Sequence, residues 1–220
     1  MTWQIGEELG DGRWHAPAAQ RNRGPILEVL TRVLPPTGLV LEVGSGTGEH
    51  VVHFAQALPR LTWQPTEPDA ALRRSIALWV RHEQLGNVRE PLALDVRERP
   101  WPVSAADAVV CINVVHVSPW ATTLDLLAGA ADILPLGGVL YCYGPYRRHG
   151  RHTAPSNEAF DAKLRAYDPE WGLRDLEQIC AAADRVGLEL AEVLDMPANN
   201  FSLILRGRDA SLRPRPGARA

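Results

Sequence analysis

The sequence predicts an α/β fold in which a mostly parallel sheet carries helices on both faces. Apolar runs of strand length alternate with helical patterns of ten or more residues, and that alternation is typical of right-handed βαβ units. The run DAVVCINVV (107–115) is apolar at consecutive positions, which predicts a central strand buried on both faces. A glycine-rich turn follows the first apolar run of the series.

The first elements are predicted from periodicity and from helix-ending residues. Residues 1–16 show no periodicity and are expected to form an irregular cap. Residues 16–34 have apolar positions at helical spacing, and two consecutive prolines end the pattern. A buried strand is predicted at 38–44, and the helix at 47–58 gathers its apolar side chains on one face.

The middle of the chain continues the alternation. A second strand is predicted at 61–68, and Asp69 is placed to cap a helix over 70–86. A third strand is predicted at 88–96. After the central strand, the helix predicted at 118–138 ends in proline and glycine.

The last elements surround a polar stretch. A strand is predicted at 139–146, and the following polar loop leads to a short helix at 158–168. A further helix is predicted at 173–187. Residues 188–207 then give two strands joined by a turn at MPANN. The proline- and arginine-rich tail, 207–220, is expected to be disordered.

Composition indicates a cytoplasmic globular protein. Of the 220 residues 45% are hydrophobic and 22% charged, with a net charge of −3, which disfavours a dedicated nucleic-acid binder. The amino terminus lacks the apolar core of a signal peptide, and no run reaches the roughly 18 apolar residues of a spanning helix. The three cysteines are widely separated and resemble neither a zinc site nor a redox pair.

The glycine-rich turn raises the question of its ligand. Gly44, Gly46 and Gly48 lie between a predicted strand and a helix, where glycine allows positive φ and close approach of backbone to a ligand. The dinucleotide pattern G-x-G-x-x-G fails because its sixth position is Glu49, and no G-K-[ST] follows for a phosphate loop. The turn therefore favours a ligand without a polyphosphate.

Acidic residues at successive strand ends describe that ligand further. Glu42 ends the first strand and can accept from a cationic amine. Glu67 ends the second, where an acid can bind both hydroxyls of a ribose. Asp95 ends the third, where a carboxylate can accept an exocyclic amino group. An amine, a ribose diol and an aminopurine without phosphate together indicate S-adenosylmethionine.

On these residues the chain resembles the class I S-adenosylmethionine-dependent methyltransferases. LEVGSGTG is similar to their motif I, TEPD to their acidic second-strand end and LALDV to their third-strand aspartate. The resemblance implies a Rossmann-like, seven-stranded, mostly parallel sheet in the order 3-2-1-4-5-7-6, with the last strand antiparallel. It also implies one domain over 1–206, with 1–34 as an amino-terminal cap or lid and 145–172 as an acceptor-side insertion.

More narrowly, the chain resembles a family of methyltransferase-like proteins. Its segments RNRGPILEVL, GSGTGEHVVHFA, WQPTEPD, CINVVHVSPW, GRHTAPSNEAF with its continuation to RDLE, and MPANN are close to that family's motifs and cover roughly residues 17–206. Gly44 replaces an alanine of the family pattern and Glu67 an aspartate. The family supplies no agreed substrate.

The candidate cofactor residues lie at the strand ends or in the expected lid. His50, at the amino end of its helix, is expected to border the cofactor carboxylate. Arg21 and Asn22 are assigned to the lid mainly from the resemblance. The full predicted set is Glu42, Gly44, Gly46, Gly48, His50, Glu67, Pro68, Asp95, Val96, Asn113, Arg21 and Asn22.

Candidate acceptor residues come from three segments. His116 is interpreted as a general base or acceptor-binding residue, or else as a structural histidine; Trp120 either walls the acceptor pocket or packs the next helix. Guanidinium groups bind carboxylates and phosphates through paired donors. We therefore expect the polar loop either to hold an acceptor anion or to be solvated. The loop candidates are Tyr146, Arg147 and Arg151, and the turn candidates, for the acceptor or for the turn alone, are Asn199 and Asn200.

The function predicted is transfer of a methyl group from S-adenosylmethionine to N, O or S of a small anionic metabolite. The alternatives are a non-catalytic S-adenosylmethionine-binding or scaffold protein and an RNA or protein methyltransferase; a dehydrogenase is disfavoured by Glu49. His50 and His53 share a helix face but lack a third ligand, so no metal is expected. We expect no nucleic-acid or membrane partner, and a monomer or homodimer.

Overall fold

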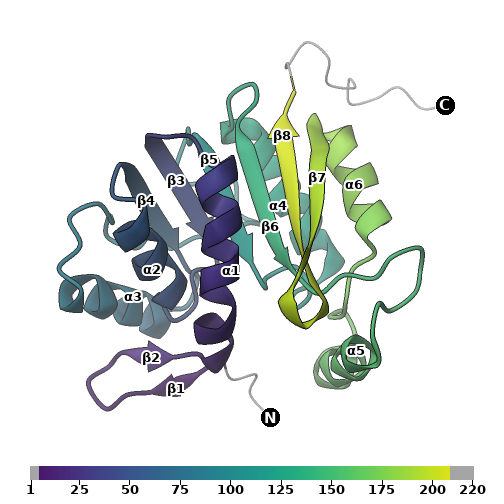
Figure 1. Ribbon diagram of the computed structural model, residues 1–220, viewed down its shortest axis with the longest axis horizontal. Helices are drawn as coiled ribbons and strands as arrows, with labels where there is room; N and C mark the ends of the chain where they lie inside the picture. The colour runs from purple at the N-terminus through teal and green to yellow at the C-terminus, as the bar shows by residue number, and fades with distance from the viewer. Residues whose placement is uncertain (1–4, 209–220) are drawn as a thin grey trace.

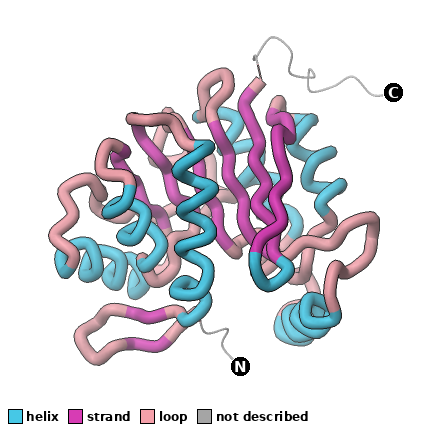
Figure 2. The backbone as a smooth tube through the Cα atoms, viewed as in Figure 1, coloured by secondary structure: helices cyan, strands magenta, loops and turns pink. Residues whose placement is uncertain are grey.

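The computed structural model describes residues 5–208. A six-stranded sheet in the order β4-β3-β5-β6-β8-β7 forms its centre, and a separate two-stranded sheet pairs β1 with β2. Figure 1 shows helices on both sides of the large sheet, and Figure 2 shows the loops gathered at the strand ends. The strands of the large sheet are β3 (Gly38–Val43), β4 (Leu61–Thr66), β5 (Ala108–Ile112), β6 (Val139–Gly144), β7 (Leu188–Met196) and β8 (Asn200–Gly207).

The sheet is mixed, as expected. The strands β4, β3, β5 and β6 pair in parallel, whereas β8 runs antiparallel to both β6 and β7. A short 3-10 turn, η1 (Pro197–Asn199), joins β7 to β8. The antiparallel last strand, inserted between its two neighbours, confirms the expected end of the strand order.

The prediction of a seven-stranded sheet is wrong by one strand. Residues 88–96 form only two isolated bridges to β4, Trp63 to Val88 and Thr66 to Leu92. Pro65, in β4 between those bridges, has no N–H to donate to this neighbour. The side-chain amide of Gln64 donates to the carbonyl of Glu90 instead, at 2.8 Å. The interrupted ladder leaves the other six strands in the predicted order.

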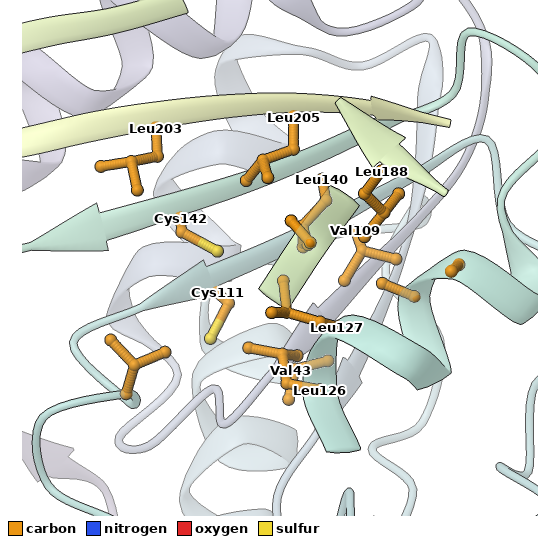
Figure 3. Close-up of a cluster of buried hydrophobic side chains, with 14 of the residues drawn as sticks. Val43, Val109, Cys111, Leu126, Leu127, Leu140, Cys142, Leu188, Leu203 and Leu205 are labelled. Carbon is orange, nitrogen blue, oxygen red and sulfur yellow. The ribbon is translucent and has the colours of Figure 1, made fainter. Parts of the chain in front are cut away.

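Two apolar cores lie on opposite faces of the sheet. One packs α1 (Pro17–Val33), α2 (Glu49–Ala57) and α3 (Ala70–His82) against the strands. The other packs α4 (Trp120–Ile133) and α6 (Leu176–Arg185), and Figure 3 shows its leucines and valines around Cys111 and Cys142. Cys111 in β5 lies opposite Cys142 in β6 in the register of the sheet. Both cysteines act as small core residues, as their apolar segments indicate.

Local sequence explains the helix ends. Asp69 caps α3, because its carboxylate accepts from the backbone N–H groups of Ala71 and Leu72. The helix α5 (Pro155–Tyr167) starts three residues earlier than predicted, with Pro155 in its first turn. Figure 1 shows α5 set apart from the sheet, near the β7–β8 turn, where the Asn157 side chain donates to the carbonyl of Asn199.

The amino-terminal cap is more regular than predicted. Residues Glu7–Glu8 (β1) and Trp14–His15 (β2) form an antiparallel hairpin. The hairpin docks on α3: the Trp14 N–H donates to the Ser75 hydroxyl, and the Trp79 indole donates to the Trp14 carbonyl. Local periodicity gave no indication of this hairpin because its stabilising contacts come from a helix about 60 residues away in the sequence.

The carboxyl-terminal prediction is partly wrong. Gly207 belongs to β8, and the Arg208 side chain pairs with Asp184 and Glu189, so the expected disorder does not begin at 207. The remainder of the predicted disordered tail lies outside the described residues. Among residues 5–208, none of the helices is long and apolar enough to cross a membrane.

Candidate cofactor and acceptor site

A cavity of about 1250 Å³ lies at the carboxyl ends of the parallel strands. In sheets of this type ligands bind where the strand order reverses, beyond those ends. Its lining includes the turn after β3, the ends of β4 and β5, the start of α1, part of α5 and the η1 turn. The volume exceeds the roughly 300–1,000 Å³ of a usual small-molecule pocket, so the cavity has room for a cofactor and a second molecule.

Many predicted cofactor residues meet at this cavity. The lining contains Arg21, Asn22, Gly44, Gly46, His50, Glu67, Pro68, Asp95, Val96 and Asn113. Two members of the predicted set, Glu42 and Gly48, lie behind the lining. Most of the predicted set therefore comes together at one cavity, because the strand ends converge once the topology is known.

The glycines of the turn have different structural reasons. All three adopt positive φ: 67° at Gly44, 55° at Gly46 and 95° at Gly48, which favours glycine. A Cβ at Gly48 would lie 2.8 Å from the Ile76 Cα, within α3. Gly48 is therefore required for close packing of the turn against α3, rather than for contact with a ligand. A Cβ at Gly46 would approach only Ile5, so Gly46 is the position open to the cavity.

Glu67 fixes the glycine turn as well as lining the cavity. Its carboxylate accepts from the backbone N–H of Gly46 at 3.0 Å and from that of Asp69 at 3.1 Å. Burial raises the pKa of Glu67, although these two hydrogen bonds oppose the shift. The carboxylate oxygens retain further lone pairs for a ligand diol.

Asp95 lies at the other edge of this half of the cavity. Both of its carboxylate oxygens accept from the Arg97 guanidinium. Those hydrogen bonds lower the pKa of Asp95, so the group is a carboxylate at neutral pH. The charge-assisted hydrogen bonds from Arg97 hold the Asp95 carboxylate in one orientation. Val96, the next residue, also lines the cavity.

Glu42 is buried directly behind the glycine turn. Its side chain is 2% exposed and one oxygen, Oε2, has no hydrogen-bond partner among the described residues. Burial raises the pKa of Glu42 to about 8. A buried carboxyl group with an unused oxygen is costly unless a ligand or water supplies a donor.

Glu49 has a role that sequence reasoning missed. It accepts from the His15 ring, the Ala16 N–H, the Gln20 amide and the Thr47 hydroxyl. Burial would raise the pKa of Glu49, but the hydrogen bonds outweigh it and lower that pKa. The residue that breaks the dinucleotide-binding pattern in the sequence is therefore also the one that fastens the amino-terminal segment to the glycine turn. Only its first-turn position at α2 was visible in the sequence.

Asn22 and His50 meet across two helices. The His50 ring nitrogen Nε2 lies 2.7 Å from Asn22 Oδ1, and Asn22 also hydrogen-bonds the Tyr143 hydroxyl. Burial lowers the pKa of His50 to about 4, which keeps its ring neutral. His53, on the same helix, packs edge-on against Phe54 and is absent from the lining.

Asn113 and His116 follow β5 and line the same cavity. Asn113 leaves β5 with φ 59°, a conformation that asparagine tolerates better than most residues. His116 lines the cavity, is 2% exposed, and its Nδ1 has no partner among residues 5–208. Burial lowers the pKa of His116 to about 3. The ring is therefore neutral and suited to hydrogen bonding, and a poor proton acceptor at neutral pH.

The loop side chains that were predicted to hold an acceptor anion do not reach the cavity. Tyr146 is 0% exposed and packs in the core beside α4 and α6, because it continues the inward alternation of β6. Arg147 pairs through its backbone with Arg174 and Leu176. Arg151 is exposed, in a bridge with Arg148. None of these three side chains lines the cavity.

Of the remaining candidates for acceptor binding, one lines the cavity and two do not. Trp120 begins α4 and packs against the apolar core, so its packing interpretation holds. Asn200 lines the cavity, whereas Asn199 is exposed and serves the turn. Sequence reasoning missed three lining residues on α5, whose three-residue spacing was the available indication, and a fourth in the loop after that helix. They are Asn157, Phe160 and Lys163 on α5, and Trp171.

The order and direction of the strands are those of a known fold. The mixed sheet, with helices on both faces, has the α/β Rossmann-like fold of solved methyltransferases. The chain is similar to an O-methyltransferase family protein from Burkholderia thailandensis, with a TM-score of 0.75 and 18% identity. The match covers 88% of this chain and 58% of that one.

Two further solved structures show the same fold. CalO1, a methyltransferase in calicheamicin biosynthesis with S-adenosylhomocysteine bound, matches with a TM-score of 0.67 and 19% identity over 86% of this chain and 55% of its own. Human N-acetylserotonin methyltransferase, in complex with S-adenosylmethionine, matches with a TM-score of 0.72 and 14% identity, over 87% and 53%. This chain thus spans little more than half the length of each.

Residues 13–207 match the family model described as "Protein of unknown function (DUF938)". The chain belongs to the DUF938 family.

Proposed function

We propose that this protein is an S-adenosylmethionine-dependent methyltransferase that acts on N, O or S of a small anionic metabolite. One observation carries the proposal: the glycine turn, Glu67 and Asp95 line a single cavity although they follow three different β segments. The motif segments within residues 17–206 support membership of the methyltransferase-like family that they resemble. The solved relatives with S-adenosylhomocysteine or S-adenosylmethionine bound support the choice of cofactor.

The residues present fit that cofactor. Gly46 leaves one wall of the cavity without a side chain, and Glu67 presents a carboxylate for the ribose hydroxyls. Among residues 5–208 no group donates to the buried Glu42 Oε2, and a cationic amine, directly or through water, would supply a donor. Asp95 can accept from an exocyclic amino group. When bound, the cofactor supplies an electrophilic methyl group on a sulfonium.

The chain's own residues then have positioning roles. The neutral His116 can hydrogen-bond the acceptor and orient its nucleophilic atom, within the roughly 3–3.5 Å that in-line attack requires. Its low pKa favours acceptor binding over the role of general base. The amino-terminal segment, fastened by Glu49, excludes water from the cofactor side. The cofactor would leave as a neutral thioether, and an acceptor whose nucleophilic atom is already deprotonated when it binds would need no base from the chain.

Calorimetry tests the cofactor site. We expect the wild type to bind S-adenosylhomocysteine with micromolar affinity, and Asp95→Asn to weaken binding about tenfold, because a charged acceptor for the amino group is lost. Glu98→Gln is the matched control, since it alters an exposed carboxyl group close to Asp95 in the sequence that does not line the cavity. Absence of binding by the wild type, or equal affinity in Asp95→Asn, would contradict the assignment.

A further inference from the structure

The charges of the cavity are unevenly distributed. Its cofactor half is bordered by Arg21, Glu67, Asp95 and Arg97. The other half is lined by residues between 112 and 200, and among those described Lys163 is the one with a charged side chain. Lys163 is also the only lysine in the sequence. A second ligand in this half would therefore meet a single cation.

The walls beside Lys163 are aromatic and apolar. Phe160 precedes it by three positions on α5, which places both side chains on the same side of the helix, and both line the cavity. Trp171 forms part of the same lining. The Phe160 ring also stands edge-on to His116, at 5.8 Å between centroids. This half is thus an apolar slot with neutral hydrogen-bonding groups and one positive end.

Backbone contacts hold the slot together as a unit. Gly172, next to Trp171, donates its N–H to the His116 carbonyl. Asp161 on α5 accepts from the Leu173 N–H, and Arg174 donates to the carbonyl of Val115. The segment 171–174 is therefore fixed to both α5 and the loop after β5, so the aromatic walls are built before an acceptor binds.

We propose that Lys163 is a specificity-determining residue that binds the carboxylate of a flat, apolar methyl acceptor. This inference rests on the proposed function and names the acceptor class for the same site. A single ammonium suits a singly charged carboxylate, whereas phosphate groups are usually held by several donors. The aromatic walls accommodate a planar body, and a cationic acceptor would be repelled. Arg147 and Arg151, expected to supply the cation, do not line the cavity.

The test compares acids with their uncharged amides. The probes are 4-hydroxybenzoate, 4-hydroxycinnamate and indole-3-acetate, each paired with its carboxamide, and binding is measured by calorimetry with S-adenosylhomocysteine saturating. We expect the wild type to bind at least one acid about fivefold or more tightly than its amide, as an exposed charge pair permits. Lys163→Met should abolish that preference while leaving affinity for the amide unchanged.

Two further variants complete the design. Lys163→Arg retains the charge and should retain the preference for the acid, and Arg151→Met removes an exposed cation outside the cavity and should change neither affinity. Methylation assays with labelled S-adenosylmethionine on the same pairs should follow the same order.

The outcomes separate the two proposals. If no acid of the panel binds, if the wild type binds acids and amides equally, or if Lys163→Met keeps the preference, the acceptor class assigned here is wrong. If S-adenosylhomocysteine itself does not bind the wild type, the proposed function fails and this inference fails with it. Intact binding of S-adenosylhomocysteine in all variants shows that only the acceptor side was altered.

Discussion

Glu42 illustrates how a single buried residue connects stability with ligand binding. Its carboxyl group lies under the glycine turn, and one of its oxygens has no hydrogen-bond partner in the described part of the chain. Burial raises its pKa to about 8, and the nearby Glu67 adds to that shift. Because the folded state favours the protonated form, folding without a ligand is less favourable when Glu42 must ionise.

The raised pKa of Glu42 predicts a specific pH dependence. Between about pH 4.5 and pH 8 the folded state holds a proton that the unfolded state has released. As the pH rises through this range, the free energy of unfolding therefore falls by up to about 1.4 kcal/mol per pH unit. Glu42→Gln removes this term. The free energy of unfolding of Glu42→Gln, measured relative to the wild type, should therefore rise by about 2–3 kcal/mol between pH 5 and pH 7.5. Urea unfolding without ligand at both pH values measures the gain.

The exposed Glu90 provides the control for this experiment. Glu90→Gln alters the same chemical group on the surface and should leave the pH dependence of the wild type unchanged. A constant difference between Glu42→Gln and the wild type at the two pH values would show that Glu42 is ionised in the folded protein. The comparison across pH is unaffected by any packing change that the amide introduces.

At the scale of elements, the amino-terminal hairpin and α1 are attached to the glycine turn through few side chains. Glu49, at the start of α2, accepts from residues at the end of β2 and the start of α1. Ser75 makes a second link, since its hydroxyl donates to the Thr47 carbonyl and accepts from Trp14. The cover over the cofactor half thus depends on polar contacts between elements distant in sequence.

Removing the Glu49 carboxylate should release that cover. Glu49→Ala leaves several donors without their acceptor, and we expect a loss of about 2–3 kcal/mol in the free energy of unfolding. Faster amide hydrogen exchange over residues 14–20 should accompany the loss. The control is Glu28→Ala, which removes an exposed carboxylate from α1 itself. Unchanged exchange over 14–20 in Glu49→Ala would contradict the anchoring role.

The same anchor has a defined pH window. Hydrogen bonds lower the pKa of Glu49 below its ordinary 4.5. A carboxylate with a lowered pKa contributes stability above its unfolded pKa and loses it as the pH falls through the folded value. The difference in free energy of unfolding between Glu49→Ala and the wild type should therefore have its full size near neutral pH and become smaller below about pH 4.

At the scale of the whole molecule, both ends of the described chain close one cavity. Residues at the start of α1 and in the η1 turn line it together with the central strand ends. A ligand in the cofactor half contacts segments that are remote in sequence, and it stabilises the folded state by mass action. With free ligand at 100 times its dissociation constant the gain is about 2.7 kcal/mol.

Hydrogen exchange with S-adenosylhomocysteine should map this coupling. We expect protection at 16–25, 44–50, 94–97 and 113–117, because the lining residues fall within these segments. Peptides from α6 and β7 contribute no lining residue and should show no local protection. Protection confined to one segment, or centred on α6 and β7, would show that the ligand binds elsewhere.

Sequence reasoning succeeded where a residue's role follows from its position along one strand or helix. The acids at 67 and 95 and the glycines at 44 and 46 reached one cavity because parallel strands end at the same edge. It failed at residues 88–96, where apolar alternation predicted a strand but Pro65 of the neighbouring strand interrupts the ladder. It also failed at Tyr146, whose polar surroundings in sequence did not show that its side chain turns into the core.

By itself, the sequence determined the α/β class, the order of its helices and most of its strands, and the position of a glycine-rich turn between a strand and a helix. Hydrophobic period, glycine and proline act locally, so these features can be identified without knowing the contacts. Only the tertiary structure decided that Glu49 fastens the amino-terminal cover, that Glu42 is buried with an unused oxygen, and that Lys163 is the cation of the second half of the cavity. Those roles depend on burial and on contacts between distant segments, which exist only after the chain has packed.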